Sequence, residues 1–194
     1  MQRLKALRSR VSPSRSSFLK DTRGVAAVEF ALILPVLLIV MMGALEVSSL
    51  LNCDRKVSQI ASSVADLVSQ SESVSSSDIS DIMTAATTIL KPYDASDLQV
   101  IVGQITFDAD GNATVEWSSS YNATTSWTNG SAPPFDVPEA LAEEDSHLIV
   151  GWAKYTYTPT YGKFISSVFP EDSTIDLEHI FYLRPRLTES VTYD

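Results

Sequence analysis

The sequence predicts an α+β fold in which a long N-terminal helix and a second amphipathic helix precede an antiparallel sheet of about four strands. Three observations support this fold class. An apolar run from Val25 to Leu45 contains a single charged residue, Glu29. Apolar residues then recur at helical spacing as far as Leu90, and alternating segments follow Pro92. Fifteen of the 17 aromatic residues also lie after Pro92, which places the main packed core there.

The net charge of −10 conceals a strong asymmetry along the chain. Residues 1–24 hold seven basic side chains and one acidic side chain, whereas the remaining 170 residues hold seven basic and 23 acidic ones. A basic stub before an apolar span follows the positive-inside rule, so we expect residues 1–24 to be a cytoplasmic leader and the acidic body to be exported. Basic arms also bind nucleic acid, but the apolar span directly after this one favours a membrane.

The first element is a transmembrane helix, expected over residues 25–51. The 21 residues from Val25 to Leu45 make a helix roughly 30 Å long, which matches the hydrocarbon core of a bilayer. A buried core helix and a cleaved secretory signal are the alternatives. A secretory signal normally has an apolar region of about 7–15 residues followed by an Ala-x-Ala-like site. Here the run is longer, and residues 43–46 match such a site poorly.

Residues 52–77 are expected to extend this helix and to end in a serine-rich hinge. The extension is amphipathic, so one face needs a partner to cover it. The segment from Ser69 to Ser77 is expected to be a hinge with little to bury. The apolar positions of the extension keep three- and four-residue spacing: Leu50, Val57, Ile60, Ala61, Val64, Leu67 and Val68.

Residues 78–194 are expected to form the extracytoplasmic α+β domain. Ser77 or Asp78 is the expected N-cap of its helix, because either side chain accepts hydrogen bonds from free amides of the first turn. Lys91-Pro92 is expected to end the helix, since proline cannot continue the hydrogen-bond ladder. The helix carries a regular apolar stripe: Ile79, Ile82, Met83, Ala86, Ile89 and Leu90.

Four strands are expected after Pro92. Residues 98–107 and 113–117 are β-branched and alternating, and the turn-forming residues 108–112 join them into a hairpin. Residues 147–157 and 174–184 are the third and fourth strands. The inward-facing positions are expected to be Ile149, Ala153, Tyr155 and Tyr157 on the third strand, and Ile175, Leu177, His179, Phe181 and Leu183 on the fourth.

Residues 118–146 have no clear period and contain a possible short helix at 138–144. A long irregular segment in a small domain is either functional or a missed structural element, and the sequence leaves both open. A further short helix is expected around residues 163–169.

Few residues suggest catalysis or metal binding. The chain has no glycine-rich phosphate loop and no G-x-S-x-G or H-E-x-x-H motif, so we predict that it is not an enzyme and has no catalytic residues, cofactor or metal. His179 is interpreted as a core histidine. Asp108 and Asp110 suggest a calcium loop, but the glycine and the terminal glutamate of that motif are misplaced, so a hairpin turn is the better interpretation.

Cys53 is the only cysteine, so no intrachain disulfide can form. It lies just beyond the apolar run, where lipid attachment to a bacterial lipoprotein would be considered. The large polar Asn52 before it does not fit that signal. An unpaired thiol and an intermolecular disulfide both remain open.

The junction between leader and apolar run is the most informative feature. A carboxylate near the centre of a membrane costs about 2.5–3.5 kcal/mol, and less near the edge, where Glu29 lies. This acid follows Gly24 by five residues and precedes Phe30. An incidental interfacial acid is the alternative to a functional one.

Residues 21–51 resemble the TadE-like family of minor pilins (pseudopilins) of the Tad, or Flp, pilus. The residues that carry the resemblance are Arg23-Gly24, Val28-Glu29-Phe30-Ala31, Pro35, Gly43 and Glu46, with Tyr182-Leu183-Arg184-Pro185-Arg186 near the C-terminus.

The resemblance implies that a dedicated prepilin peptidase cleaves between Gly24 and Val25. Glu29 and Phe30 would then belong to the processing and assembly motif. Some related pilus proteins keep their leader, so the resemblance implies membrane anchoring more directly than processing.

We therefore expect a minor pilin-like component of Tad pilus biogenesis that supports pilus assembly and surface adhesion. It would cross the bacterial inner membrane once, with its N-terminus cytoplasmic. Its expected partners are other Tad pilus assembly proteins, the prepilin peptidase, the membrane and neighbouring pilin-like helices, with no nucleic acid.

The first alternative is an unprocessed, signal-anchored extracytoplasmic receptor domain. A membrane-tethered hydrolase is the second, and it would require His147 and His179 to meet over acidic side chains. Tyr155, Tyr157 and Tyr161 are interpreted as half-buried core residues, with a partner surface as the alternative.

Overall fold

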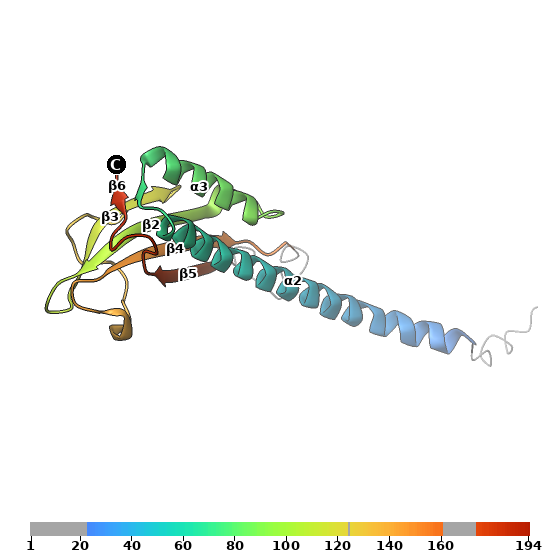
Figure 1. The fold of residues 1–194 in the computed structure, drawn as a ribbon. Coiled ribbons are helices and arrows are strands. Elements are labelled where there is room, and N and C mark those ends of the chain that lie inside the picture. Colours follow the sequence, from blue (N-terminus) through green and yellow to red (C-terminus); the bar gives the residue numbers. More distant parts are fainter. Residues whose placement is uncertain (1–22, 124, 161–173) are drawn as a thin grey trace, which may run out of the picture. The chain divides into compact units, whose positions relative to one another are not determined.

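The structure, a computed structural model, describes residues 23–123, 125–160 and 174–194. The chain divides into two compact units at the Ala44–Leu45 boundary. The predicted α+β fold class is confirmed, with a long apolar helix, a second helix and a four-stranded antiparallel sheet (Figure 1). The short helix expected at residues 163–169 lies outside the described residues.

Helix α2 (Arg23–Ser69) begins close to the predicted start and runs unbroken through Pro35. Within the first unit, its side chains are apolar on all sides and do not pack against other described residues. Most of the large hydrophobic side chains here are more than half exposed, and they include Val25, Val28, Phe30, Leu32, Ile33, Val36 and Leu37. A helix that is apolar all round requires a non-aqueous environment.

The second unit is built on a sheet with strand order β3-β2-β4-β5, in which all neighbours are antiparallel. Three of its strands follow the predicted ranges closely, whereas β3 runs four residues further than predicted. The β2–β3 pair is the predicted hairpin, and its register shifts between Gln104 and Ile105. The strands are β2 (Leu98–Phe107), β3 (Ala113–Tyr121), β4 (His147–Tyr157) and β5 (Ile175–Leu183).

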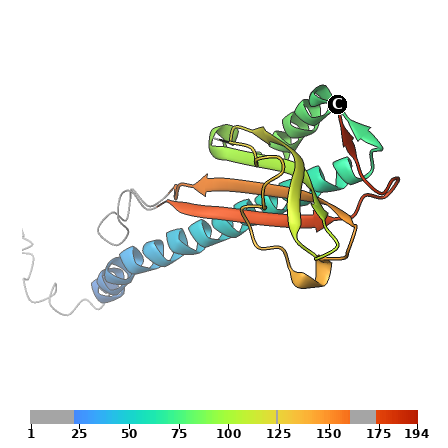
Figure 2. The same cartoon turned by 90° about the vertical axis from the view of Figure 1, so that its left-hand side faces the viewer.

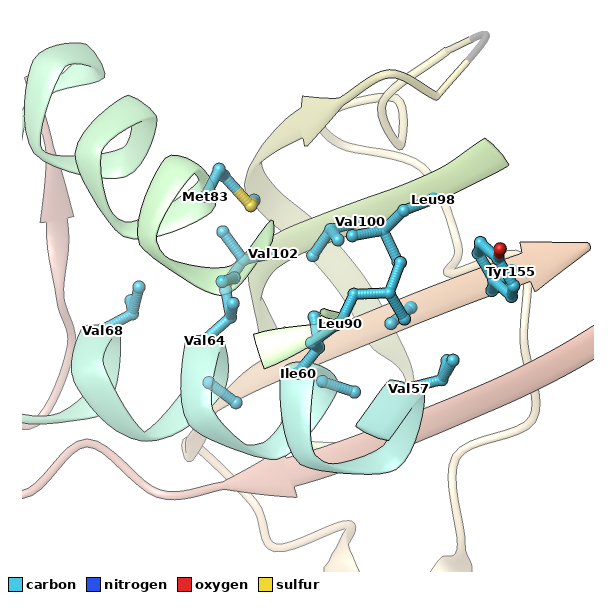
Figure 3. Close-up of a cluster of buried hydrophobic side chains, with 14 of the residues drawn as sticks. Val57, Ile60, Val64, Val68, Met83, Leu90, Leu98, Val100, Val102 and Tyr155 are labelled. Carbon is cyan, nitrogen blue, oxygen red and sulfur yellow. The ribbon is translucent and has the colours of Figure 1, made fainter. Parts of the chain in front are cut away.

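One face of the sheet is covered by the C-terminal half of α2 and by α3 (Ser76–Ile89), as Figures 1 and 2 show. The apolar stripe of α2 supplies the side chains of this core, and β4 supplies its predicted inward set (Figure 3). Tyr155 and Tyr157 are 6% and 3% exposed, so they are core residues. Tyr161 lies outside the described residues. Fully buried members include Val57, Ile60, Val64, Val68, Leu90, Leu98, Val100 and Val102.

Helix α2 approaches the sheet most closely at Gly151 of β4. A Cβ atom placed on Gly151 would overlap the carbonyl oxygen of Ala61 and lie 2.9 Å from the Cβ of Ala65. Glycine on the strand and two alanines on the helix therefore set the distance between the two elements. The larger core residues on either side can then reach the sheet.

Helix α3 begins with a capping box one turn earlier than its predicted cap. The backbone amide of Asp78 donates to Ser75 Oγ at 3.2 Å, and the Ser75 amide donates to the Asp78 carboxylate at 2.9 Å. The prediction of Ser77 or Asp78 as N-cap is therefore wrong. Asp78 is instead the N3 residue of the box, where its carboxylate also lies near the positive end of the helix dipole.

The expectation that residues 69–77 have little to bury is also wrong. Ser69 is fully buried and Val74 is 2% exposed. Strand β1 (Ser73–Val74) pairs in parallel with β6 (Thr192–Tyr193), so the end of the chain holds this segment in place. The amide of Arg186 donates to the carbonyl of Ser69 at 2.8 Å, which fixes the segment a second time.

The C-terminal segment enters the core at Val191, which is 1% exposed. Its amide donates to the buried Gln104 Oε1 at 2.7 Å, and its carbonyl accepts from Trp117 Nε1 at 2.9 Å. Tyr193 stacks on the Trp117 ring with the centroids 5.2 Å apart. A buried glutamine and a buried indole are thereby satisfied by the backbone of one distant residue, as buried polar groups require.

The segment 118–146 was predicted to be irregular. Its first residues are the end of β3, and later residues cover the second face of the sheet. Trp127 packs edge-on against Phe135 at 4.8 Å, and Phe135 contacts the Tyr182 ring at 6.1 Å. These side chains close a second hydrophobic cluster under β2, β4 and β5. The short helix predicted at residues 138–144 is the 3₁₀ turn η2 (Glu139–Leu141).

Two residues of the predicted inward faces are exposed. Leu67 of α2 is 47% exposed because it lies on the side of the helix away from the sheet, and Ile175 is 38% exposed at the first position of β5. Both predictions relied on spacing alone, which does not show where the covering partner ends.

Replacing Ser75 with alanine is expected to lower the free energy of unfolding by about 1 kcal/mol, because the cap of α3 loses its acceptor. The matched control is Ser80→Ala inside the same helix, where alanine is the better helix former. Denaturant titration of the two variants measures the difference, and equal stabilities would contradict the capping role.

The Asp78 carboxyl adds a pH dependence to this cap. The hydrogen bonds from Ser75 lower the pKa of Asp78. A lowered folded-state pKa gives stability that is complete above the unfolded value of about 3.9 and is lost as the pH falls through the folded value. We expect Asp78→Asn to reduce the acid sensitivity of unfolding below about pH 4.

Gly151→Ala is expected to destabilise the second unit by about 1–3 kcal/mol, since the added Cβ must push α2 away from the sheet. Gly43→Ala serves as the control, because a Cβ there meets no atom within 4 Å. Thermal unfolding followed by near-ultraviolet circular dichroism distinguishes the two. A neutral Gly151→Ala variant would mean that the helix is not held at this distance.

Candidate functional site: the N-terminal half of helix α2

The predicted processing junction lies within the described start of α2. Gly24, Val25 and Glu29 are all part of this helix. Val25, Glu29 and Phe30 are exposed, and a Cβ placed on Gly24 would meet no atom within 4 Å. Val25 and Glu29 are four residues apart and therefore share one face of the helix.

The apolar part of α2 meets the length and composition required of a membrane span. An 18-residue window of the helix has a mean hydropathy of 2.7, and none of its residues is buried. Among the described residues, α2 is the one helix that meets this test. The buried-core alternative is therefore not what the structure contains, because a core helix would be covered by other elements.

In the second unit, three polar contacts join α2 to the sheet and to the segment after β5. Tyr157 donates its hydroxyl to Glu46 at 2.5 Å. His179 Nε2 lies 2.7 Å from Asp54, and Arg186 lies 2.6 Å from Asp66. All three join α2 to the C-terminal half of the domain, so they fix the helix in register as well as in distance.

The burial of Tyr157 changes its acidity. Desolvation, with a smaller contribution from the hydrogen bond to Glu46, raises the pKa of Tyr157 to about 12. Tyr93 closes the same corner by donating to the carbonyl of Ser49 at 2.8 Å, and its ring meets that of Tyr157 edge-on at 6.2 Å. The neutral phenol is thus the form that holds Glu46 at any physiological pH.

His179 contacts an acidic side chain and is only partly buried. Its side chain is 30% exposed, and it contacts the Asp54 carboxylate. The interpretation of His179 as a satisfied core histidine is therefore right about its having a polar partner and wrong about its burial, because it lies on the edge strand β5.

His147 lies far from His179 within the sheet. His147 is at the first position of β4, whereas His179 pairs with Ala153 six residues along that strand. His147 faces Glu116 at 3.6 Å. The two histidines therefore do not converge as the hydrolase alternative requires, and no group of three potential metal ligands occurs within residues 23–123, 125–160 and 174–194.

Asp108 and Asp110 belong to a hairpin turn, as the sequence favoured. The Asp108 carboxylate accepts hydrogen bonds from the amides of Asp110 and Asn112 at 3.0 and 2.7 Å and from the Asn112 side chain at 3.0 Å. These hydrogen bonds, with that of the Asn112 side chain the largest, lower the pKa of Asp108.

The structure buries Cys53 completely beneath the sheet. Burial, with a smaller contribution from Asp54, raises the pKa of this thiol to about 11. The thiolate is the reactive form of cysteine, so both access and protonation oppose reaction in the folded unit. An intermolecular disulfide at Cys53 would need the helix to leave the sheet first.

Residues 24–66 match the family model described as TadE-like protein. This segment of the chain is TadE-like. The resemblance predicted from residues 21–51 is confirmed, and the match continues 15 residues further along α2 than the resemblance did. No curated protein and no solved structure gives a significant match to the chain.

The TadE-like segment contains both parts of α2. It begins with Gly24 at the junction, includes the whole apolar span, and ends where the helix is buried against Gly151. It supports a membrane-anchored, pilin-like role associated with the Tad pilus. The remaining residues, from Leu67 onward, lie outside the match and form the sheet, α3 and the C-terminal segment.

The native protein is expected to leave Cys53 unlabelled by a thiol reagent at pH 8 over hours. A Gln59→Cys variant made in a Cys53→Ser background should react within minutes, because position 59 is exposed on the same helix. Denaturant should make the two proteins react at equal rates. Rapid labelling of native Cys53 would show that α2 separates from the sheet readily.

Proposed function

We propose that this chain is a minor pilin, or pseudopilin, of the Tad pilus that is anchored in the bacterial inner membrane and supports pilus assembly and surface adhesion. The observation that carries the proposal is the TadE-like match over residues 24–66. It coincides with a helix whose first part is apolar on nearly all sides and whose second part is amphipathic, with one face buried in the folded domain. The acidic domain lies outside the cytoplasm, and the basic leader lies inside.

Processing is the finer part of the proposal. A prepilin peptidase cuts between Gly24 and Val25, and the new Val25 amine, with a reference pKa of about 7.7–8.0, is largely cationic. The Glu29 carboxylate of a neighbouring subunit offsets this charge inside the helix bundle, and Phe30 packs beside it. Glycine before the cut supports this reading, because it leaves the backbone accessible to a protease.

The absence of a convergent set of acids and histidines among the described residues favours a structural role over catalysis. The domain supplies protein contacts through the surface that is left after α2 and α3 cover the first face of the sheet. The TadE-like helix supplies contacts with other apolar helices.

The experiment is N-terminal sequencing and intact mass measurement of the membrane-extracted protein, produced with and without the candidate peptidase. We expect a mature chain that begins at Val25 in the presence of the peptidase. Gly24→Leu should abolish the mass shift without unfolding the protein, because a side chain at position 24 meets no atom within 4 Å.

Gly43→Leu is the matched control, since a Cβ at this glycine of the same helix also meets no atom within 4 Å. It should be processed as the parent protein is. A parent protein that retains Met1 beside an active peptidase would favour the alternative, an unprocessed signal-anchored receptor domain.

A further inference from the structure

We propose that a cleft between the β2–β3 turn and the 132–142 segment docks a basic segment of a partner protein that inserts one aromatic or aliphatic side chain. The cleft has a volume of about 370 Å³. It lies at the end of the sheet where β2 ends and β4 begins, opposite the end at which Tyr157 contacts Glu46.

The lining of the cleft is partly apolar and partly polar. Its apolar side chains are Phe107 and Ala113 from the hairpin, and Pro133, Phe135 and Val137 from the opposite segment. Protein clefts that bind small ligands have volumes of about 300–1,000 Å³, so this one is sized for one or two side chains. Apolar side chains and carboxylates in one lining are suited to a hydrophobic side chain flanked by positive charge.

The walls of the cleft are fixed before any partner arrives. The Asp108 carboxylate closes the hairpin turn through the backbone and side chain of Asn112. On the other side, Phe135 is held between Trp127 and Tyr182, and the Tyr182 hydroxyl donates to the carbonyl of Asp136 at 3.0 Å. A preformed site binds without paying the ordering cost of a mobile loop.

The chain segment that forms the cleft is acidic. Residues 107–146 contain eight acidic residues and no lysine, arginine or histidine. Asp136 and Glu139 line the cleft itself. Elsewhere in this segment, Arg184 pairs with Glu143 at 2.5 Å and lowers the pKa of that carboxyl, and His147 lies 3.6 Å from Glu116. Complementary charge across an interface speeds encounter and selects the partner, so the partner segment carries lysine or arginine.

A second copy of this chain does not supply that positive charge. Residues 25–194 hold seven basic against 23 acidic side chains. Lys154, Arg184 and Arg186 are already in ion pairs, and Lys56 donates to the carbonyl of Ile89, whereas Arg55 and Lys91 are exposed. Because residues 25–194 are acidic overall, the net charge opposes the approach of a second copy, and the proposed occupant is a different protein. The inference does not depend on whether the leader is cleaved.

The test uses the full chain in nanodiscs of zwitterionic lipid and a capped pentapeptide with phenylalanine between two pairs of lysines. We expect the peptide to shift the methyl signals of Ala113, Ala132 and Ala142 in NMR spectra, all of which line the cleft. Replacing the phenylalanine of the peptide with alanine should weaken binding at least fivefold, and so should 0.5 M salt, which screens the charges.

Two pairs of protein variants separate the cleft from general acidity. Asp136→Asn with Glu139→Gln should weaken binding at least threefold, whereas Asp81→Asn with Glu189→Gln removes the same charge elsewhere and should leave it within twofold. Ala132→Phe fills the cleft and should abolish the methyl shifts. Ala85→Phe adds the same bulk to an exposed position of α3 and should leave them unchanged.

Three results would overturn the proposal. The first is an absence of shifts at about 5 mM peptide, a concentration that detects even millimolar affinity. The second is equal binding of the phenylalanine and alanine peptides, which would reduce the effect to non-specific charge. The third is a shift of the same methyl groups by 1 mM calcium alone, which would make the cleft a cation site.

Discussion

The close contact between α2 and β4 is the constraint on which the second unit depends. With glycine at position 151 and alanine at 61 and 65, a helix backbone and a strand meet without intervening side chains. The flanking valines and isoleucines then fill the space on both sides rather than separating the layers. Protein cores are close-packed, so a contact of this kind leaves no room for gradual adjustment. Polar contacts accompany this packing: Glu46 binds Tyr157 of β4, Asp54 binds His179 of β5, and Asp66 binds Arg186 after β5.

The same helix serves two environments through a change in its pattern. Before Ala44 it is apolar on every side, and after Leu45 it carries one buried face and one polar face. The TadE-like match extends across this change and so unites the anchor with the domain it carries. The proposed pilin-like role uses both parts: the apolar part is proposed to contact lipid or other helices, and the amphipathic part packs against the sheet.

Much of this fold could be predicted from the sequence because its elements have clear periods. The limits of α2, the stripe of α3 and the alternation in β4 are local properties. The N-cap was predicted wrongly although Ser75 and Asp78 have the spacing of a capping box, because Ser75, Ser76 and Ser77 are the same residue type. The pairing of Val74 with β6, about 120 residues later, could not be predicted from a local pattern. Spacing also could not show that Leu67 and Ile175 lie beyond the covered surfaces.

Part of the candidate site could likewise be predicted from the sequence, and part could not. Gly24, Glu29 and Phe30 form a contiguous pattern that needs no folding to be recognised. The acidic cleft could not be predicted, because residues 107–113 and 132–142 have no shared period and meet only in three dimensions. The cover of the second sheet face was missed for a related reason. Trp127 and Phe135 are isolated core side chains on irregular backbone, and isolated residues give no periodic pattern in the sequence.

The placement of Val191 has a consequence for the order of events during synthesis. The core between Trp117 and Gln104 stays open until this residue reaches it, and β1 has no partner until Thr192 and Tyr193 are present. Contacts so distant in sequence form late and slowly. A nascent chain would therefore keep apolar side chains of the incomplete sheet exposed until residues 191–193 had been synthesised.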